Sequence, residues 1–469
     1  MSDALLTLCV DEAGLAAIGA ALSRLARPGD TFLLQGPVGA GKSHLARAFI
    51  RANLGEGTEV PSPTFTLVQT YEAGEAEIWH ADLYRLSDSA EVDELGLTDA
   101  IGSQICLIEW PDRLPDPVPD ALVVDLAADT NPDLRRVTLH GGARWRSAAR
   151  AAFVAAAGWG DAGLAPLAGD ASARSYIRLT RAGDSAVLMD APAGSLGPFI
   201  AMTDWLRERG FHAPRILAQE DASGLMLLED FGDALMARVV GADPAQAAPL
   251  YSRVAGLLAD LHRHAPPDFV APMDGAAFEA QLAMFADHYA AEVGGQAAAA
   301  QVGPVVRALY DQLCGDVAPV VSLRDFHAEN IVLTPDNRLG LLDYQDAVAT
   351  HPAYDLVSLL HDARRDVDTE TEAAAIARYL DASGADPDRF GAAYALLGAA
   401  RNLRIMGIFA RLCVQDGKPR YLDFMPRVWA HILRETAHPR LAALRELVVQ
   451  VPAPDDAMIE RFRARCPTR

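Results

Sequence analysis

One glycine-rich run constrains the fold of this chain more than any other feature of its sequence. Residues 36–43 read Gly-Pro-Val-Gly-Ala-Gly-Lys-Ser and fit the pattern G-x-x-x-x-G-K-S/T. The apolar run before them predicts a strand, and Lys42–Leu54 predicts a helix with one apolar side. In such a loop, backbone N–H groups surround phosphate oxygens at the positive end of a helix. The run therefore predicts a loop that binds nucleotide phosphates through Gly36, Gly39, Gly41, Lys42 and Ser43.

Lysine is almost absent from the chain, which gives its presence in this loop more weight. The 469 residues contain only Lys42 and Lys418, while arginine is used almost everywhere else. We expect Lys42 to reach the outer phosphates of ATP and the hydroxyl of Ser43 to be a ligand of Mg²⁺.

Two acidic residues at predicted strand ends complete this first candidate site. Asp82 and Glu109 each end an apolar run, and strand ends of a parallel sheet share the edge that carries the glycine-rich loop. The Ser62–Phe65 loop adds the hydroxyl of Thr64. Nucleotide hydrolysis needs groups of this kind to hold the metal and to orient water. Asp82 and Glu109 are therefore predicted catalytic residues, and Glu109 is also a predicted metal ligand.

The first third of the chain alternates predicted strands with predicted helices. This order indicates an α/β sheet that is parallel in its centre, ending near residue 143. An alanine-rich run then predicts a helix over Ser147–Ala157. We accordingly predict one domain over residues 1–142 and a second over residues 147–469. The strands predicted in the first domain are Thr31–Gln35, Glu77–Asp82, Ile105–Glu109, Ala121–Leu126 and Arg136–Leu139.

The charge of the chain argues against direct nucleic-acid binding. The formal net charge is -22. Residues 1–150 contain 12 bases and 22 acids (a net -10), and the rest contains 29 bases and 41 acids (a net -12). Neither part presents the basic surplus that binds phosphate backbones. A role in RNA metabolism would therefore depend on a protein partner.

The cysteines and the hydropathy predict a cytoplasmic protein. The five cysteines are scattered and none forms C-x-x-C, so neither a disulfide framework nor a zinc site is expected. Cys9 and Cys106 lie in apolar runs and are predicted core residues. The N-terminus lacks the apolar segment of a signal peptide, and no run of 18 apolar residues predicts a membrane span.

Several motifs of the first domain occur in an order that resembles the TsaE family. They are the glycine-rich loop, S-P-T-F at 62–65, H-x-D-x-Y-R at 80–85, E-L-G at 94–96 and I-E-W at 108–110. TsaE is a P-loop ATPase of the bacterial machinery that makes threonylcarbamoyladenosine in tRNA. The resemblance implies ATP hydrolysis within a complex with TsaB and TsaD subunits. It places Ser43 and Glu109 at Mg²⁺, Thr64 and Asp82 at the metal and water, and Trp110 beside the site.

A second group of polar residues lies between residues 325 and 343. Asp325 and Asn330 are five residues apart, as in kinase catalytic loops, where the acid positions the acceptor hydroxyl and the amide holds Mg²⁺. A predicted hairpin over Ile331–Asp343 ends at Asp343, the position of a second metal ligand. Asp355 is expected to be a buried acid that braces the catalytic loop, with a solvated helix cap as the alternative.

The segment before this loop differs from the front lobe of protein kinases. It has no G-x-G-x-x-G, and residues 169–176 (G-D-A-S-A-R-S-Y) stand where a phosphate-covering loop belongs, with Ser172 and Arg174 as candidate ligands of ATP. The following strand lacks the usual lysine, so Arg174 or Arg178 is a candidate replacement, although both could be solvated. Glu229 lies where a hinge would hold adenine through its backbone.

Strand-like runs at the front and helices at the back predict a two-lobed, kinase-like α+β fold. The motifs resemble the aminoglycoside-phosphotransferase superfamily, and within it the AmgK family of anomeric kinases for N-acetylmuramate and N-acetylglucosamine. This resemblance rests on G-D-A-S-x-R-x-Y, L-M-D-A-P, R-D-F-H-A-E-N, L-D-Y-Q-D-A and H-P-A-Y-D-L. It implies transfer of the γ-phosphate of ATP to an amino sugar, with Asp325 catalytic and Asn330 and Asp343 at Mg²⁺.

Two alternatives for the second domain remain open at the level of sequence. It could phosphorylate another alcohol, such as choline, homoserine or an aminoglycoside. It could instead bind nucleotide as an assembly module without transferring phosphate, which the missing lysine favours and the intact Asp325, Asn330 and Asp343 oppose. Residues 401–404 (R-N-L-R) and 418–421 (K-P-R-Y) are candidates for holding the acceptor, or are ordinary helix and loop residues.

Overall fold

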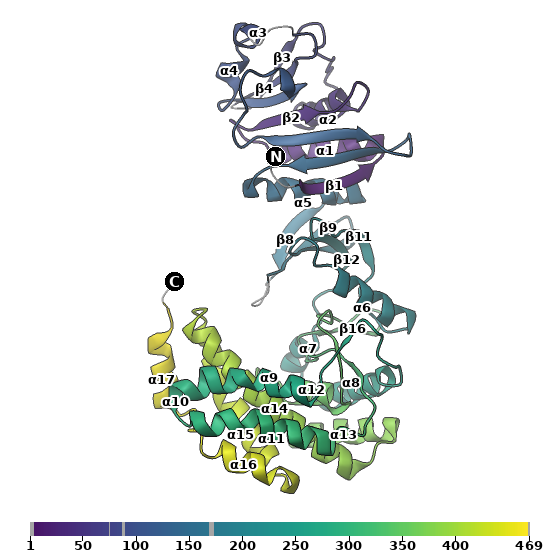
Figure 1. Cartoon of the computed structure of the whole chain (residues 1–469). Helices are drawn as coiled ribbons and strands as arrows, with labels where there is room; N and C mark the ends of the chain where they lie inside the picture. The colour runs from purple at the N-terminus through teal and green to yellow at the C-terminus, as the bar shows by residue number, and fades with distance from the viewer. Residues whose placement is uncertain (1–3, 75, 87–89, 168–172, 468–469) are drawn as a thin grey trace. The chain divides into compact units, whose positions relative to one another are not determined.

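The structure, a computed structural model shown in Figure 1, describes residues 4–74, 76–86, 90–167 and 173–467. The chain divides into two compact units. The first comprises residues 1–197 and 215–230, and the second comprises residues 198–214 and 231–469.

A mixed sheet forms the centre of the first unit. Among the described residues it has seven strands in the order β1-β7-β6-β2-β5-β4-β3. β2 runs parallel to β5 and β6, and β4 runs parallel to β5, while the outer pairs are antiparallel, as predicted for a sheet with a parallel centre. The strands are β1 (Ala4–Val10), β2 (Thr31–Gln35), β3 (Val68–Ala73), β4 (Ala76–Asp82), β5 (Ile105–Glu109), β6 (Leu122–Ala128) and β7 (Arg135–His140).

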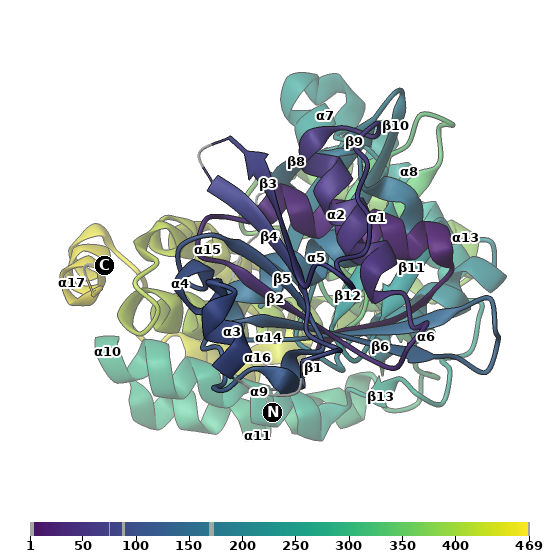
Figure 2. The ribbon, with the colours of Figure 1, turned by 90° about the horizontal axis from the view of Figure 1, so that it is seen from above.

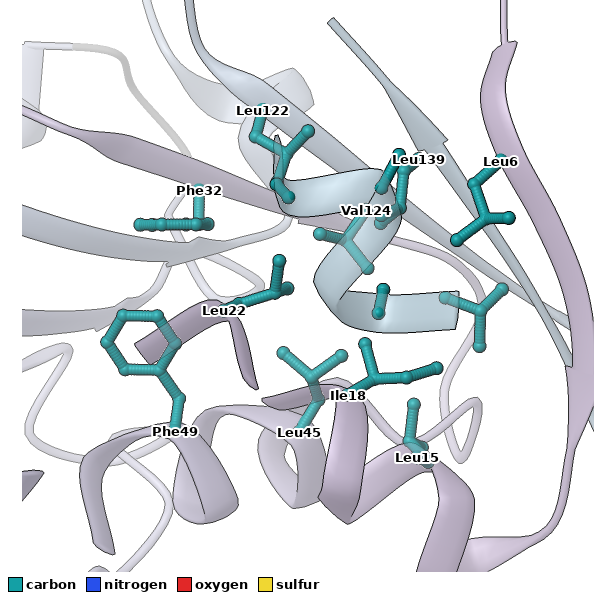
Figure 3. Close-up of a cluster of buried hydrophobic side chains, with 14 of the residues drawn as sticks. Leu6, Leu15, Ile18, Leu22, Phe32, Leu45, Phe49, Leu122, Val124 and Leu139 are labelled. Atoms are coloured by element: carbon teal, nitrogen blue, oxygen red, sulfur yellow. The ribbon is translucent and has the colours of Figure 1, made fainter. Parts of the chain in front are cut away.

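Side chains of β2 alternate between two buried faces of this sheet. Phe32 and Leu34 belong to a core with α1 and α2, whereas Leu33 belongs to a core on the opposite face, because successive strand residues point to opposite sides. Figure 3 shows part of the first core. The helices of this part are α1 (Glu12–Leu25), α2 (Lys42–Leu54), α3 (Ala90–Glu94) and α4 (Leu97–Ala100), with the short turn η1 (Pro111–Arg113).

α1 and α2 lie side by side, as Figure 2 shows. Gly19 permits this close approach, because a Cβ atom there would lie 2.6 Å from the carbonyl oxygen of Leu45 in α2. A side chain at this position would push the two helices apart and open the core beneath them.

A second, antiparallel sheet completes the first unit. Among the described residues its order is β11-β12-β10-β9-β8. Leu179, Leu188 and Leu227 of this sheet belong to the same buried cluster as Phe153 and the apolar residues of α1. The two sheets of this unit therefore share one core. The elements are η2 (Ala143–Trp145), α5 (Arg146–Val154), η3 (Ala155–Trp159), β8 (Gly163–Leu167), β9 (Ser175–Arg181), β10 (Asp184–Asp190), β11 (Ile216–Glu220) and β12 (Leu225–Glu229).

The second unit is mostly helical, as predicted for the back of the chain. Its larger helices are α6 (Gly197–Glu208), α7 (Met236–Ala242), α8 (Ala247–Leu261), α9 (Gly275–Met284), α11 (Gln296–Leu313), α12 (Ala353–Leu360), α13 (Thr369–Ser383), α14 (Pro387–Val414), α15 (Met425–Thr436), α16 (Ala442–Val448) and α17 (Asp456–Arg465). Shorter helical turns are η4 (Pro244–Gln246), η5 (Phe285–Ala290), α10 (Ala291–Val293), η6 (Pro419–Phe424) and η7 (Pro439–Leu441).

Short strands position the polar loop of this unit. β15 and β16 pair as an antiparallel hairpin, which confirms the predicted hairpin before residue 343. β17 pairs with both β13 and β14. These strands are β13 (Ala271–Pro272), β14 (Val320–Ser322), β15 (Ile331–Leu333), β16 (Leu339–Leu341) and β17 (Val348–Thr350).

The structure corrects two predictions about cysteine. Cys106 is buried as predicted, but Cys9 is exposed, because it lies on the face of β1 opposite to the buried Leu6 and Val10. Cys413 and Cys466 form a disulfide although no framework was expected, since helices α14 and α17 bring residues 53 positions apart into contact. No helix in the described part of the chain is long and apolar enough to cross a membrane.

Candidate functional site

The glycine-rich loop connects β2 to α2, as predicted. Gly36, Gly39 and Gly41 have φ angles of 129°, 80° and 106°, which glycine adopts without strain. A Cβ atom at Gly36 would lie 2.1 Å from the carbonyl oxygen of Leu126, so the fold also excludes a side chain there. The loop leads directly into the N-terminus of a helix, where backbone N–H groups attract phosphate.

Lys42 is held inside this loop. Its Nζ donates to the carbonyl oxygens of Gly36 (2.8 Å) and Pro37 (2.9 Å) and lies 3.9 Å from the centre of the Trp110 ring. Burial lowers the pKa of Lys42, and the nearby carboxylate of Glu109 opposes this shift. The ammonium group is thus fixed at the loop, next to the tryptophan that the sequence placed beside the site.

Glu109 lies at the end of β5, at the same level of the sheet as Asp82 on β4. It is buried, with 2% of its surface exposed. The hydroxyl of Ser43 donates to its Oε2 (3.0 Å), and Nε2 of His80 lies 3.0 Å from its Oε1. The structure therefore brings Ser43, Glu109 and Asp82 to one edge of the sheet, as the sequence predicted.

Asp82 is also buried and fixed by hydrogen bonds. The Thr64 hydroxyl donates to its Oδ2 (2.7 Å), and the backbone N–H of Tyr84 donates to its Oδ1 (3.1 Å). The hydroxyl of Ser62 lies 2.8 Å from that of Thr64. A hydroxyl and a carboxylate held together in this way can orient a water molecule or a metal-bound ligand.

His80 is a member of this site to which the sequence assigned no role. It is 1% exposed, and its Nδ1 makes no hydrogen bond within the described part of the chain. His80 and Asp82 are two residues apart on β4 and so point to the same face of the sheet. This spacing within the H-x-D-x-Y-R motif is the signal that could have identified His80.

The polar loop of the second unit lies between β14 and β15 and is braced by Asp355. The carboxylate of Asp355 accepts hydrogen bonds from the Ser322 hydroxyl (2.5 Å) and from the N–H groups of Leu323 (2.6 Å) and Arg324 (3.2 Å). Burial raises the pKa of Asp355 to about 6, although these hydrogen bonds act in the opposite direction. The prediction that Asp355 is a buried brace is confirmed.

The three predicted polar residues of this loop lie together. The Asn330 amide donates to the carbonyl oxygen of Asp325 (2.8 Å) and to Oδ2 of Asp343 (3.4 Å). Gln345 donates to Oδ1 of Asp343 (2.8 Å), and the N–H of Leu342 donates to the carbonyl oxygen of Asn330 (2.9 Å). The Asp325 side chain is exposed and can reach an acceptor molecule.

The candidate ATP ligands of the antiparallel sheet are only partly described. Ser172 lies outside the described residues, and Arg174 directly precedes β9. Arg178 pairs with Asp230, with Nε 2.7 Å from Oδ2 and Nη2 donating to Oδ1 at 3.1 Å. An arginine bound in this way is fixed in position, which a solvated strand residue would not be.

The strand that would carry a kinase lysine ends instead with an acid. Asp190 of β10 accepts a hydrogen bond from Arg146 (3.2 Å from Nε) and lies 3.5 Å from Arg150, both on α5. Glu229 accepts a hydrogen bond from the N–H of Arg215 (3.0 Å), and its own N–H donates to the carbonyl oxygen of Arg215 (2.9 Å). The Glu229 N–H is therefore already engaged at the predicted hinge.

The two sites belong to two classes of ATP enzyme. The first combines a phosphate-binding loop with buried acids at a sheet edge, as in P-loop ATPases. The second combines an exposed acid with an amide and an acid at kinase spacing, as in kinase-like phosphotransferases.

Comparison with known proteins defines the families. The family model for threonylcarbamoyl adenosine biosynthesis protein TsaE matches residues 9–137. The model for the phosphotransferase enzyme family matches residues 163–393. The chain belongs to both families, as a TsaE-type ATPase domain joined to an ATP-dependent phosphotransferase.

Relatives of both parts are similar in sequence to this chain. The N-acetylmuramate/N-acetylglucosamine kinase of Caulobacter vibrioides is 40% identical over 347 residues, covering 64% of this chain and 95% of that protein. The TsaE protein of Rickettsia bellii is 40% identical over 97 residues, covering 21% of this chain and 67% of that protein. The TsaE protein of Rickettsia conorii is 45% identical over 89 residues, and the chain spans about half (51%) of its length.

Proposed function

We propose that this chain is a bifunctional ATP enzyme whose activities divide near residue 143. The C-terminal part phosphorylates the anomeric hydroxyl of N-acetylmuramate or N-acetylglucosamine, and the N-terminal part is an ATPase that supports threonylcarbamoyladenosine formation in tRNA. The kinase assignment rests on one observation above all. Asn330 connects Asp325 to Asp343 in the part of the chain that is similar to an amino-sugar kinase over 95% of that kinase.

In the proposed kinase reaction, the exposed Asp325 carboxylate accepts the proton of the acceptor hydroxyl while that oxygen attacks the γ-phosphorus of ATP. ADP is the leaving group. The oxygen donors of Asn330 and Asp343 suit Mg²⁺, which would neutralise charge on the phosphates when bound. Asp355 keeps the loop rigid by accepting the hydrogen bonds of its backbone.

The antiparallel sheet would supply the other contacts to ATP. We propose that residues 169–176, with Ser172 and Arg174, cover the phosphates of ATP. We also propose that the backbone around Glu229 binds the adenine. Arg178, fixed by Asp230, is a second candidate for the cation that replaces the missing lysine.

In the proposed ATPase, the glycine-rich loop and Lys42 bind the phosphates of ATP. The hydroxyl of Ser43 and the carboxylate of Glu109, 3.0 Å apart, are oxygen ligands that suit Mg²⁺. Asp82 and Thr64 would orient the attacking water. The negative net charge supports action through TsaB-like and TsaD-like partners rather than direct tRNA binding. Dependence of both activities on ATP supports the predicted cytoplasmic location.

One assay tests the kinase assignment. The purified chain is incubated with Mg-ATP and, separately, with N-acetylmuramate, N-acetylglucosamine, choline or kanamycin, and products are identified by mass spectrometry. We expect a sugar 1-phosphate from at least one amino sugar. Phosphorylation of only choline or kanamycin would assign another acceptor, and no phosphorylated product would indicate a nucleotide-binding module.

A further inference from the structure

Three arginines of the second unit belong to the candidate kinase loop or to α14, which packs against α12, the helix that braces this loop. Arg324 precedes Asp325 in the loop, and Arg401 and Arg404 lie three residues apart on α14, a spacing that places them on neighbouring parts of one helix face. Arg324, Asp325 and Arg401 are all close enough to Arg404 to influence its pKa electrostatically.

The packing of α12 against α14 holds these arginines near the loop. α12 carries Asp355, which binds the loop backbone, and Ser358, which donates to the carbonyl oxygen of Arg324 (3.0 Å). Arg401, 8% exposed, lies 3.5 Å from the carbonyl oxygen of His361 at the end of α12. The loop and the arginine face of α14 are thereby attached to the same helix.

Arg404 stands out because no acidic side chain in the described part of the chain forms an ion pair with it. Its guanidinium forms no hydrogen bond and no ion pair with any residue in the described part of the chain. It is half-buried, and burial lowers its pKa. The guanidinium of Arg324 likewise forms no ion pair with a carboxylate among the described residues. A partly buried cation without a partner lowers the stability of the folded protein, unless a bound ligand pairs with its charge.

We propose that Arg404 binds a carboxylate on the acceptor molecule and thereby determines which acceptor the kinase prefers. This inference rests on the proposed kinase function. N-acetylmuramate carries a lactyl carboxylate, which a guanidinium can bind through two parallel hydrogen bonds, whereas N-acetylglucosamine is neutral. The same arginines repel cationic acceptors such as choline and kanamycin.

The test compares Arg404→Gln with wild-type enzyme on three acceptors: N-acetylmuramate, its lactyl amide and N-acetylglucosamine. The amide removes the charge and keeps the shape of the substrate. We expect Arg404→Gln to lower kcat/KM for N-acetylmuramate about 10- to 100-fold, because a hydrogen-bonded charge is lost. The value for N-acetylglucosamine should change less than about threefold, and the variant should no longer distinguish the acid from its amide.

Arg411→Gln is the matched control, since it removes the same group from the last turn of the same helix. Arg411→Gln should leave the preference for N-acetylmuramate unchanged. Arg404→Lys should retain part of the preference that Arg404→Gln loses. Equal losses on both sugars, or no loss, would overturn the role of Arg404 while the proposed function stands. Wild-type enzyme that phosphorylates only a cationic acceptor would overturn both.

Discussion

Lys42 and Asp325 each belong to only one of the two proposed reactions, so single substitutions should separate them. Asp325→Asn removes the proton acceptor and should lower sugar phosphorylation about 10²- to 10⁴-fold. It should leave tRNA modification intact, measured with the TsaB and TsaD partners added. Lys42→Ala should have the opposite effect, because the phosphate-binding cation is lost. Loss of both activities in either variant would show that the domains are not independent.

The buried carboxylate of Glu372 has an unusual environment in the second unit. Its Oε2 lies 2.7 Å from Nη1 of Arg434, which also contacts Glu435 (2.8 Å) and His361 (2.7 Å). The ligand atoms of His361, Glu372 and Glu435 are close enough to hold a metal ion, but the guanidinium already supplies the positive charge there. His361 connects this cluster to α14, because its carbonyl oxygen lies 3.5 Å from Nη1 of Arg401.

Acid should destabilise this cluster. Burial alone would raise the pKa of Glu372, but the contacts with His361 and Arg434 outweigh it and lower the pKa from 4.5 to about 2. Because the folded-state value is depressed, the stabilisation is complete above about pH 4.5 and disappears as the pH falls towards 2. Wild-type protein should lose ~3 kcal/mol more stability over this range than Glu372→Gln, measured by urea unfolding at each pH. Identical pH profiles would contradict this.

At the scale of elements, α5 connects the two sheets of the first unit. Phe153 is 3% exposed and belongs to the core that contains residues of both sheets. Arg146 adds a link to β10 through Asp190. Because α5 contacts both α1 and β12, its apolar residues stabilise both partners at once.

Phe153→Ala should therefore destabilise the whole first unit. We expect a loss of about 3–5 kcal/mol in the free energy of unfolding, because a large buried ring is replaced by a cavity. Leu164→Ala on β8 is the control, since Leu164 is 65% exposed and its truncation should cost less than about 0.5 kcal/mol. Calorimetry of both variants measures the difference, and a Phe153→Ala protein as stable as the control would contradict a shared core.

At the scale of the whole molecule, the core that contains Phe153 connects part of the phosphotransferase to the ATPase domain. A fragment that begins at residue 143 would expose the side of α5 and η3 that packs on α1. We expect its first thermal transition to lie below that of the full chain and its binding of a hydrophobic dye to increase, because buried apolar surface becomes exposed. Unchanged melting and dye binding would show that the two parts are structurally independent.

Local motifs made the first site predictable from the sequence. Residues 36–43 follow β2, while Asp82 and Glu109 end β4 and β5. The order of these strands places their ends at one edge of the sheet. Asp325 and Asn330 were equally predictable from the sequence, because a spacing of five residues is a local property. The sequence assigned no role to His80, because its place in the site depends on a contact with Glu109, 29 residues away.

Sequence alone determined the parts of this protein whose conformation depends on neighbouring residues: the glycine-rich loop, the candidate kinase loop and the alternation of strands and helices. Tertiary structure alone decided which distant residues meet. Arg401 meets His361, Cys413 pairs with Cys466, and α5 joins two sheets, because helices and strands bury their apolar faces together. Such burial is non-directional, so no short pattern encodes the partner that each face finds.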